Sequence, residues 1–98
     1  MERLGMELRL LGSGSGHGTC PAAYAADSGE LVIQGDITGR NAVAVPHRLL
    51  NWLEPGMRLT VEASEQPDKI LVPGELVTDP KILQQLKLAD HETAVVVH

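Results

Sequence analysis

The residues of this sequence that could bind a metal ion or react with a substrate are few and far apart. His17 and Cys20 are spaced as a possible ligand pair, but His47, His91 and His98 are distant from them in the sequence. A structural zinc site commonly uses two close ligand pairs, so a single pair predicts no metal site. We favour surface histidines beside one buried thiol, with a metal- or redox-responsive domain as the alternative.

Catalytic chemistry has no evident set of residues either. The glycine-rich stretch over 12–18 follows an expected strand, as a phosphate-binding loop would. Its glycines alternate with other residues, however, and no Lys-Ser/Thr pair or clear helix follows it. No carboxylate pair, Ser-His-Asp order or activated lysine stands out elsewhere. The sequence therefore predicts a non-enzymatic protein with no catalytic residue and no cofactor, and a flexible loop over 12–18.

The charge of the chain disfavours nucleic acid as its main ligand. The formal net charge is −5, and the 8 Lys and Arg residues are scattered rather than clustered. Duplex DNA favours clustered cations, because each neutralised phosphate releases counterions. The single cysteine allows no intrachain disulfide, and the N-terminal residues resemble neither a signal peptide nor a membrane span. We therefore expect a cytoplasmic protein that binds no membrane.

The composition predicts one small domain with a thin core. A chain of 98 residues, 43% of them hydrophobic, holds a single domain over 1–98. Phe is absent, and Trp52 and Tyr24 are the only aromatic residues. A core built of aliphatic side chains is only marginally stable, and burying a strand edge or an apolar face between two copies would stabilise it. We therefore expect a homodimer.

Hydrophobic periodicity predicts a mainly β fold, a small sheet or barrel with two short helices. Alternating or β-branched runs indicate strands, which we place at 6–11, 21–26, 30–34, 42–45, 57–63, 69–72 and 93–97. Pro46 suits a helix start, so the first helix is expected over about 46–54. Asp79 caps the second helix, expected over about 79–88.

An internal repeat accompanies this pattern. The residues 31–37 align with 70–76, a strand followed by Gly, an acid and an apolar residue. Each copy leads to a further strand, 42–47 in the first copy and 93–98 in the second, where a helix is inserted. The repeat predicts a pseudo-duplicated sheet, and chance similarity of short β segments is the alternative.

Residues 18–53 resemble the small actinobacterial regulatory proteins typified by BldB. The resemblance lies in Gly-Thr-Cys-Pro-Ala-Ala-Tyr from Gly18, Leu-Val-Ile-Gln-Gly-Asp from Leu31, and the segment from Ala42 to Leu53 that contains Trp52. It implies a non-enzymatic, dimeric accessory of helix-turn-helix regulators. The chain departs from that pattern at 34–36, which reads Gln-Gly-Asp, and it continues beyond the Trp helix.

Residues 43–72 resemble a different family, the swapped-hairpin domains of the AbrB/MazE type. The resemblance runs from Val43-Ala44-Val45-Pro46 through Glu54-Pro55-Gly56 to the strand at 69–72. It implies a dimer with interleaved strands that binds DNA or serves as an antitoxin. Arg40 and Arg48 would be the DNA-binding residues.

Taken together, the sequence favours a small acidic regulatory adaptor that acts through protein–protein contacts. The expected contact residues are Trp52, Leu49 and Leu53, on one face of the first helix, with an exposed strand edge as a further possibility. The alternative interpretation of the same three side chains is a stripe packed on the domain's own core. The second function class is the swapped-hairpin DNA-binding or antitoxin-type regulator.

Overall fold

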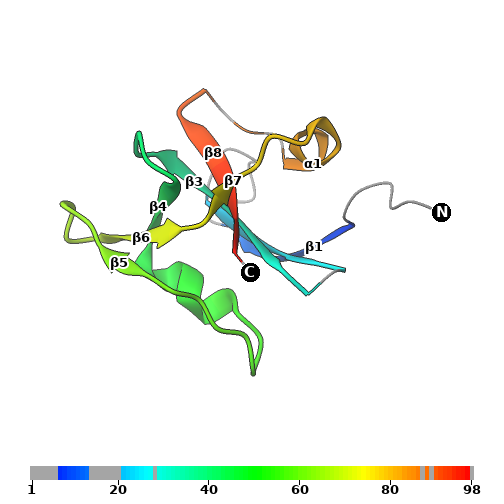
Figure 1. Cartoon of the computed structure of the whole chain (residues 1–98). Helices are drawn as coiled ribbons and strands as arrows, with labels where there is room; N and C mark the ends of the chain where they lie inside the picture. The colour runs from blue at the N-terminus through cyan, green and yellow to red at the C-terminus, as the bar shows by residue number, and fades with distance from the viewer. Residues whose placement is uncertain (1–6, 14–20, 28, 87, 89, 98) are drawn as a thin grey trace.

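A computed structural model describes residues 7–13, 21–27, 29–86, 88 and 90–97, which form one antiparallel sheet of eight strands with two helices (Figure 1). The strands are β1 (Leu8–Ser13), β2 (Ala22–Ala26), β3 (Leu31–Ile37), β4 (Ala42–Pro46), β5 (Glu62–Ala63), β6 (Lys69–Pro73), β7 (Glu75–Leu76) and β8 (Glu92–Val97). The helices are the 3-10 helix η1 (His47–Trp52) and the α-helix α1 (Pro80–Leu86). The mainly β fold with two short helices is thus confirmed.

The first helix, expected over about 46–54, is a 3-10 helix over His47–Trp52. Two local expectations need correction. Of the strand expected over 57–63, only β5 pairs with a neighbour, whereas 57–61 has no strand pairing. Hydrophobic and polar residues alternate in 57–61 because Met57 and Leu59 pack against the core, although the backbone of this segment pairs with no strand. In the loop expected over 12–18, Gly12 and Ser13 belong to β1, and 14–18 lie outside the described residues.

The two copies of the internal repeat occupy equivalent places, and each pairs with the strand of the other copy. β3 pairs with β8, and β6 pairs with β4 in the same relative register. In the β3–β8 pair, the opposite residues are Leu31 and Val97, Val32 and Val96, Ile33 and Val95, and Gln34 and Ala94. In the β6–β4 pair, they are Ile70 and Val45, Leu71 and Ala44, Val72 and Val43, and Pro73 and Ala42. The two halves therefore interleave their strands in a pseudo-twofold arrangement.

The two hairpins follow the same relation. Asp36 opposes Ala44 in the β3–β4 hairpin as Glu75 opposes Val96 in the β7–β8 pair. This register makes Ala94 the counterpart of Ala42.

Glycine is required in each half where the repeat segment passes the strand that follows it in the same half. A Cβ on Gly35 would lie 2.6 Å from the carbonyl oxygen of Ala44, and a Cβ on Gly74 would lie 2.6 Å from that of Val96. Real Cβ atoms do not approach a backbone oxygen so closely, so only glycine lets the crossing strand pass. The glycine of the repeat is thus a packing requirement, and it is the same requirement in both halves.

The interior of the sheet is aliphatic and is shared by the two halves. Its cluster of buried residues is Ala23, Leu31, Ile33, Val43, Val45, Leu49, Ile70, Val72 and Val95. Leu49 of η1 belongs to this cluster, so η1 closes one end of the interior. A second cluster lies on the outside of the sheet, where α1 covers part of β3 and β8; its members are Val32, Val77, Ile82, Leu86, Ala94 and Val96.

The longest path through the sheet runs β1-β2-β3-β4-β6-β5, so β1 and β5 are the ends of this path. β7 ends the branch in which β8 pairs with β3. Within the described part of the chain, neither helix is long and apolar enough to cross a membrane. Figure 1 places α1 and the turn between β5 and β6 on opposite sides of the molecule.

Candidate functional site

The candidate site is built on a row of residues that crosses four strands. Asp36 of β3 opposes Ala44 of β4, Ala44 opposes Leu71 of β6, and Leu71 opposes Glu62 of β5. Directly opposite residues in neighbouring strands point to the same side of a sheet. Because Val43, Val45, Ile70 and Val72 fill the interior, this row lies on the outside of the sheet.

A groove of about 540 Å³ follows this row. Ala44 and Leu71 form its floor, and its walls come from the β3–β4 hairpin and from the β5–β6 turn. The residues that line it are Asp36, Ile37, Thr38, Arg40, Ala44, Ala63, Ser64, Glu65, Gln66 and Leu71. An exposed concave surface with apolar and charged groups is the usual form of a binding site.

Hydroxyl groups fix both walls of the groove. Thr38 Oγ1 donates a hydrogen bond to the carbonyl of Ala42 at 2.8 Å and accepts one from the backbone N–H of Arg40 at 3.2 Å. In the opposite wall, Ser64 Oγ lies 2.9 Å from the carbonyl of Lys69 and accepts the N–H of Gln66 at 3.0 Å. Such side-chain bonds to local backbone stabilise tight turns, so the groove is pre-formed.

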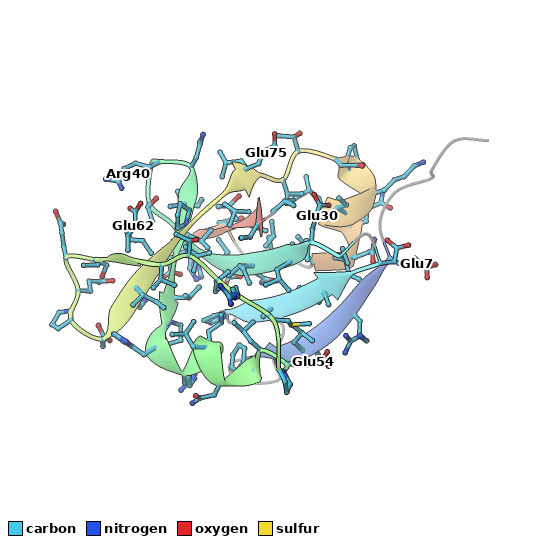
Figure 2. The ribbon with its side chains drawn as sticks, turned by 60° about the horizontal axis from the view of Figure 1, so that its bottom comes forward. Glu7, Glu30, Arg40, Glu54, Glu62 and Glu75 are labelled. Carbon is cyan, nitrogen blue, oxygen red and sulfur yellow. The ribbon has the colours of Figure 1, made fainter. Side chains whose placement is uncertain are left out.

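Ion pairs connect the charged side chains around the groove. Lys69 Nζ lies 2.5 Å from Asp36 Oδ2. Arg40 Nη2 lies 3.5 Å from Glu62 Oε1 and so bridges the two walls. Figure 2 shows Arg40, from the turn before β4, close to Glu62 of β5. Since these two pairs are each neutral, Glu65 leaves the groove with a surplus negative charge.

The groove has a counterpart on the other half of the molecule, and that counterpart is covered. We call Asp36, Thr38, Ala44 and Leu71 the open face. The pseudo-twofold relation matches them to Glu75, Val77, Val96 and Val32, which we call the covered face. Three of these four, Val32, Val77 and Val96, are buried together with Ile82 and Leu86 of α1. One half of the sheet thus carries its own helix where the other half has a groove.

A polar cluster lies beside the open face, where β8 pairs with β3. Donor atoms of Asp36, His91 and Glu92 lie within 4.8 Å of one another, a set that could hold a divalent cation. The ammonium of Lys69 already balances Asp36, and Glu92 accepts a hydrogen bond from Gln34 Nε2 at 3.1 Å. These contacts satisfy the carboxylates with groups of the protein itself.

Tyr24 faces the same polar cluster from β2. Burial raises the pKa of the Tyr24 phenol, and the negative charge of Glu92 raises this pKa further. Glu92 is 5% exposed, so its carboxylate is buried in the sheet. Gln34 is 1% exposed, and among the described residues its Oε1 has no hydrogen-bond partner. The cluster is therefore a group of polar side chains buried in the sheet.

Comparisons with protein-family models, with curated proteins and with solved structures gave no match. The two family resemblances in the sequence therefore stay predictions, and the geometry of the described residues carries the functional argument.

The three expected contact residues of the first helix lie on or in the core. Leu49 is 0% exposed and contacts the interior cluster, against which Trp52 and Leu53 pack while half-buried. The indole of Trp52 covers Gly12 of β1, where a Cβ would lie 2.4 Å from Trp52 Cγ. These contacts correspond to the alternative interpretation, in which the helix stripe packs on the domain's own core.

The two arginines of the alternative function lie apart. Arg40 precedes β4 in the hairpin and Arg48 follows it in η1, so the length of this strand separates them. Arg40 lines the groove and pairs with Glu62, and Arg48 is exposed. His17 and Cys20 lie outside the described residues.

Sequence reasoning missed the floor and the acidic wall of the groove. Ala44, Leu71 and Glu65 carry no chemical motif, and their meeting depends on the pairing of β4 with β6. One signal could have found them. The repeat places Ala44 and Leu71 at the counterparts of residues that α1 covers, and the first copy lacks such a helix.

Proposed function

We propose that this protein is a non-enzymatic regulatory adaptor that binds a partner protein through the groove over its open face. The observation that carries the proposal is the difference between two equivalent faces. The chain covers one of them with α1 and leaves the other as a groove of about 540 Å³. A partly apolar sheet face that lacks a cover is a surface suited to a partner.

The groups that line the groove favour binding over catalysis. Asp36 and Arg40 are each held in an ion pair, and the Thr38 and Ser64 hydroxyls bond the backbone of their own turns. An acid, base or nucleophile must be directed at a substrate in a productive geometry. These side chains are instead bonded to groups of the protein itself, which gives the groove a defined arrangement of charged and polar groups.

Selection of ligands from a displayed random-peptide library tests the proposal with the whole chain as bait. We expect enrichment of peptides that bind the native protein but not Ala44→Leu, because the larger side chain fills the floor of the groove. Thr60→Leu is the matched control, since it adds the same side chain at an exposed position outside the groove. If the selected peptides bind Ala44→Leu as well as the native protein, the groove is not the site.

The biological role that we attach to this adaptor rests on the BldB-type resemblance. We propose a cytoplasmic protein whose partner is a helix-turn-helix regulator. Affinity capture from its native cells, with nuclease present, tests this when native bait and Ala44→Leu bait are run in parallel. A regulator recovered by the native bait and lost with the variant supports the role, and equal recovery by both baits contradicts it.

We propose a homodimer as the working form, formed along β1. This strand ends the sheet, and Leu10 in it is 55% exposed. An edge strand with an exposed apolar side chain is a common pairing surface. Sedimentation should give twice the monomer mass for the native chain and the monomer mass for Leu10→Lys. A native monomer at about 100 μM contradicts the dimer.

The alternative is a swapped-hairpin DNA-binding or antitoxin-type regulator. It is favoured by the interleaving of strands between the two halves, which here occurs within a single chain. It requires DNA affinity that falls with salt and is reduced in Arg40→Ala and Arg48→Ala. DNA binding that both variants retain would remove these arginines from the site.

A further inference from the structure

We infer that the occupant of the open face is a short amphipathic helix of the partner protein, seated there as α1 is seated on the covered face. The inference rests on the proposed function and names the class of ligand. It further assigns to this helix a large apolar side chain above Ala44 and a basic residue beside Glu65.

α1 supplies the template for this contact. Its buried residues Ile82 and Leu86 are one helical turn apart and are 5% and 2% exposed. They pack on the covered face with Val32 and Val96. The backbone frame under a helix on the open face would be equivalent, since β4 pairs with β6 as β8 pairs with β3. Two apolar side chains at positions i and i+4 are also the usual anchors of a helix in a groove.

The strand edge next to the groove favours a helix over an extended segment. β5 comprises Glu62 and Ala63 alone, so a peptide added to this edge would gain few backbone hydrogen bonds. Peptides bound as an added strand draw much of their affinity from such bonds. A helix satisfies its own backbone and needs only the apolar floor and the charged walls.

The floor of the open face is lower than that of the covered face at one point, Ala44. Ala44 stands where the covered face has Val96, whereas Leu71 stands where it has the smaller Val32. The smaller Ala44 side chain leaves room that α1 does not have above Val96. The partner's side chain at this point must therefore be larger than the Ile and Leu of α1, and a Phe ring fits that need, because close packing fills such space.

The charge of the walls selects a basic helix. Glu65 adds a carboxylate beyond the pairs Asp36–Lys69 and Arg40–Glu62, and the whole chain carries −5. A Lys or Arg beside the apolar pair would complement this charge. The Arg40 and Glu62 side chains are 66% and 51% exposed, so they can rotate to admit a helix between the walls.

Three synthetic peptides of about 14 residues test the inference by fluorescence anisotropy and amide chemical shifts. The first is an Ala/Lys helix, stabilised by a side-chain staple, with Phe and Leu four residues apart. The second has Leu in place of the Phe. The third alternates Val and Lys and favours an extended strand. We expect the Phe helix to bind most tightly, with shift changes concentrated at Ala44, Leu71 and Glu65.

Variants of the whole chain then test each contact. Ala44→Val gives the open face the residue of the covered face, and it should reverse the preference so that the Leu helix binds more tightly than the Phe helix. Ala44→Leu should weaken the Phe helix at least about tenfold. Glu65→Lys should weaken both helices more than Glu7→Lys, which makes the same change of net charge far from the groove (Figure 2).

The possible results separate this inference from the proposed function. The helix is overturned as the occupant if the extended peptide binds more tightly than both helices. It is also overturned if neither helix binds at about 1 mM. Unchanged preference in a folded Ala44→Val overturns the contact above Ala44. The adaptor proposal falls only if the library selection yields no peptide sensitive to Ala44→Leu.

Discussion

The two outer faces of this sheet have the same strand frame and opposite surroundings. On the covered face, Val32 and Val96 are buried beneath α1. On the open face, their counterparts Leu71 and Ala44 form the floor of a groove. The difference comes from the connections, because a tight turn joins β3 to β4 whereas the segment from β7 to β8 includes α1. The strand frame is the same in both halves, and the candidate site lies on the face that α1 does not cover.

This contrast indicates which parts of a duplicated frame are constrained. The interior repeats because both halves fill one shared space, so Ile33 and Val72 are each 0% exposed and Leu31 and Ile70 nearly so. An outer face has no such partner and depends on what the chain places over it. Repeated interiors with unequal exteriors are therefore where a binding surface should be sought.

Substitution of Gly35 or Gly74 should give the largest loss of stability and tests whether the two halves are equivalent. Gly35→Ala and Gly74→Ala each place a Cβ 2.6 Å from a backbone oxygen. Because backbone cannot rotate away as a side chain can, we expect each variant to lose about 3 kcal/mol of unfolding free energy. Urea unfolding followed by circular dichroism measures this loss.

The two losses should agree if the halves are equivalent at these glycines. Gly39→Ala is a contrasting control, because Gly39 has a φ of +81° and a Cβ added there would meet no atom of the described residues within 4 Å. Its cost would be one of backbone conformation alone, about 1 kcal/mol. A Gly74 variant as stable as the native chain would contradict the pseudo-twofold frame.

Substitution of Trp52 tests whether the first helix packs on the domain's own core or binds a partner protein. We expect Trp52→Ala to lose about 2.5 kcal/mol, since the half-buried indole packs on the interior cluster and over Gly12. Gly12→Ala alone should also destabilise, but the double variant should lose less than the sum, because removing the indole makes room for the Cβ. Denaturant titrations of the four chains measure this coupling.

The same variant separates the two candidate contact surfaces. Trp52→Ala, where still folded, should bind the groove peptides as the native chain does. If a folded Trp52→Ala variant no longer binds the groove peptides, the contact surface is the face formed by Trp52 and Leu53.

A pair of equivalent side chains sharpens the comparison further. Val32 and Leu71 occupy matching positions, but Val32 is 0% exposed beneath α1 and Leu71 is half-buried in the groove. We expect Val32→Ala to cost about 2 kcal/mol and Leu71→Ala about 1 kcal/mol, although the leucine loses more atoms. Thermal and urea unfolding would measure both. Equal costs would mean that the groove is packed like a core.

Much of the fold could be predicted from the sequence because local patterns carry it. The shared order of a strand, Gly, an acid and an apolar residue in 31–37 and 70–76 marked both copies of the repeat. Pro46 and Asp79 marked the helix starts. The segment 57–61 was misassigned because alternating hydrophobic residues indicate that one side of a segment is buried. They do not indicate that its backbone is hydrogen-bonded to a neighbouring strand. The correspondence of Ala42 with Ala94 could not be predicted, because a period of two leaves the register to the partner strand.

The candidate site could not be predicted in the same way. Ala44 and Leu71 meet only through strand pairing, and Asp36 meets Lys69 and His91 across long sequence separations. Trp52 was singled out by its residue type, which signals contact surfaces and cores alike. Local signals thus predicted the elements, whereas the groove depended on which face of the sheet the chain left open.

The smallest effect concerns the ion pair between β1 and the segment after η1. Arg9 Nη1 lies 2.6 Å from Glu54 Oε2, and the hydrogen bond from Arg9 lowers the pKa of Glu54. A carboxyl with a lower pKa in the folded chain adds stability above its unfolded-state pKa and loses it as the pH falls through the folded-state pKa. Glu54→Gln should therefore be slightly less stable than the native chain at pH 7, and the difference should shrink toward about pH 3. Because both side chains are exposed, added salt should shrink it as well. Urea midpoints of both chains across this range measure the difference, and a gap that widens on acidification would show that Glu54 acts through packing rather than charge.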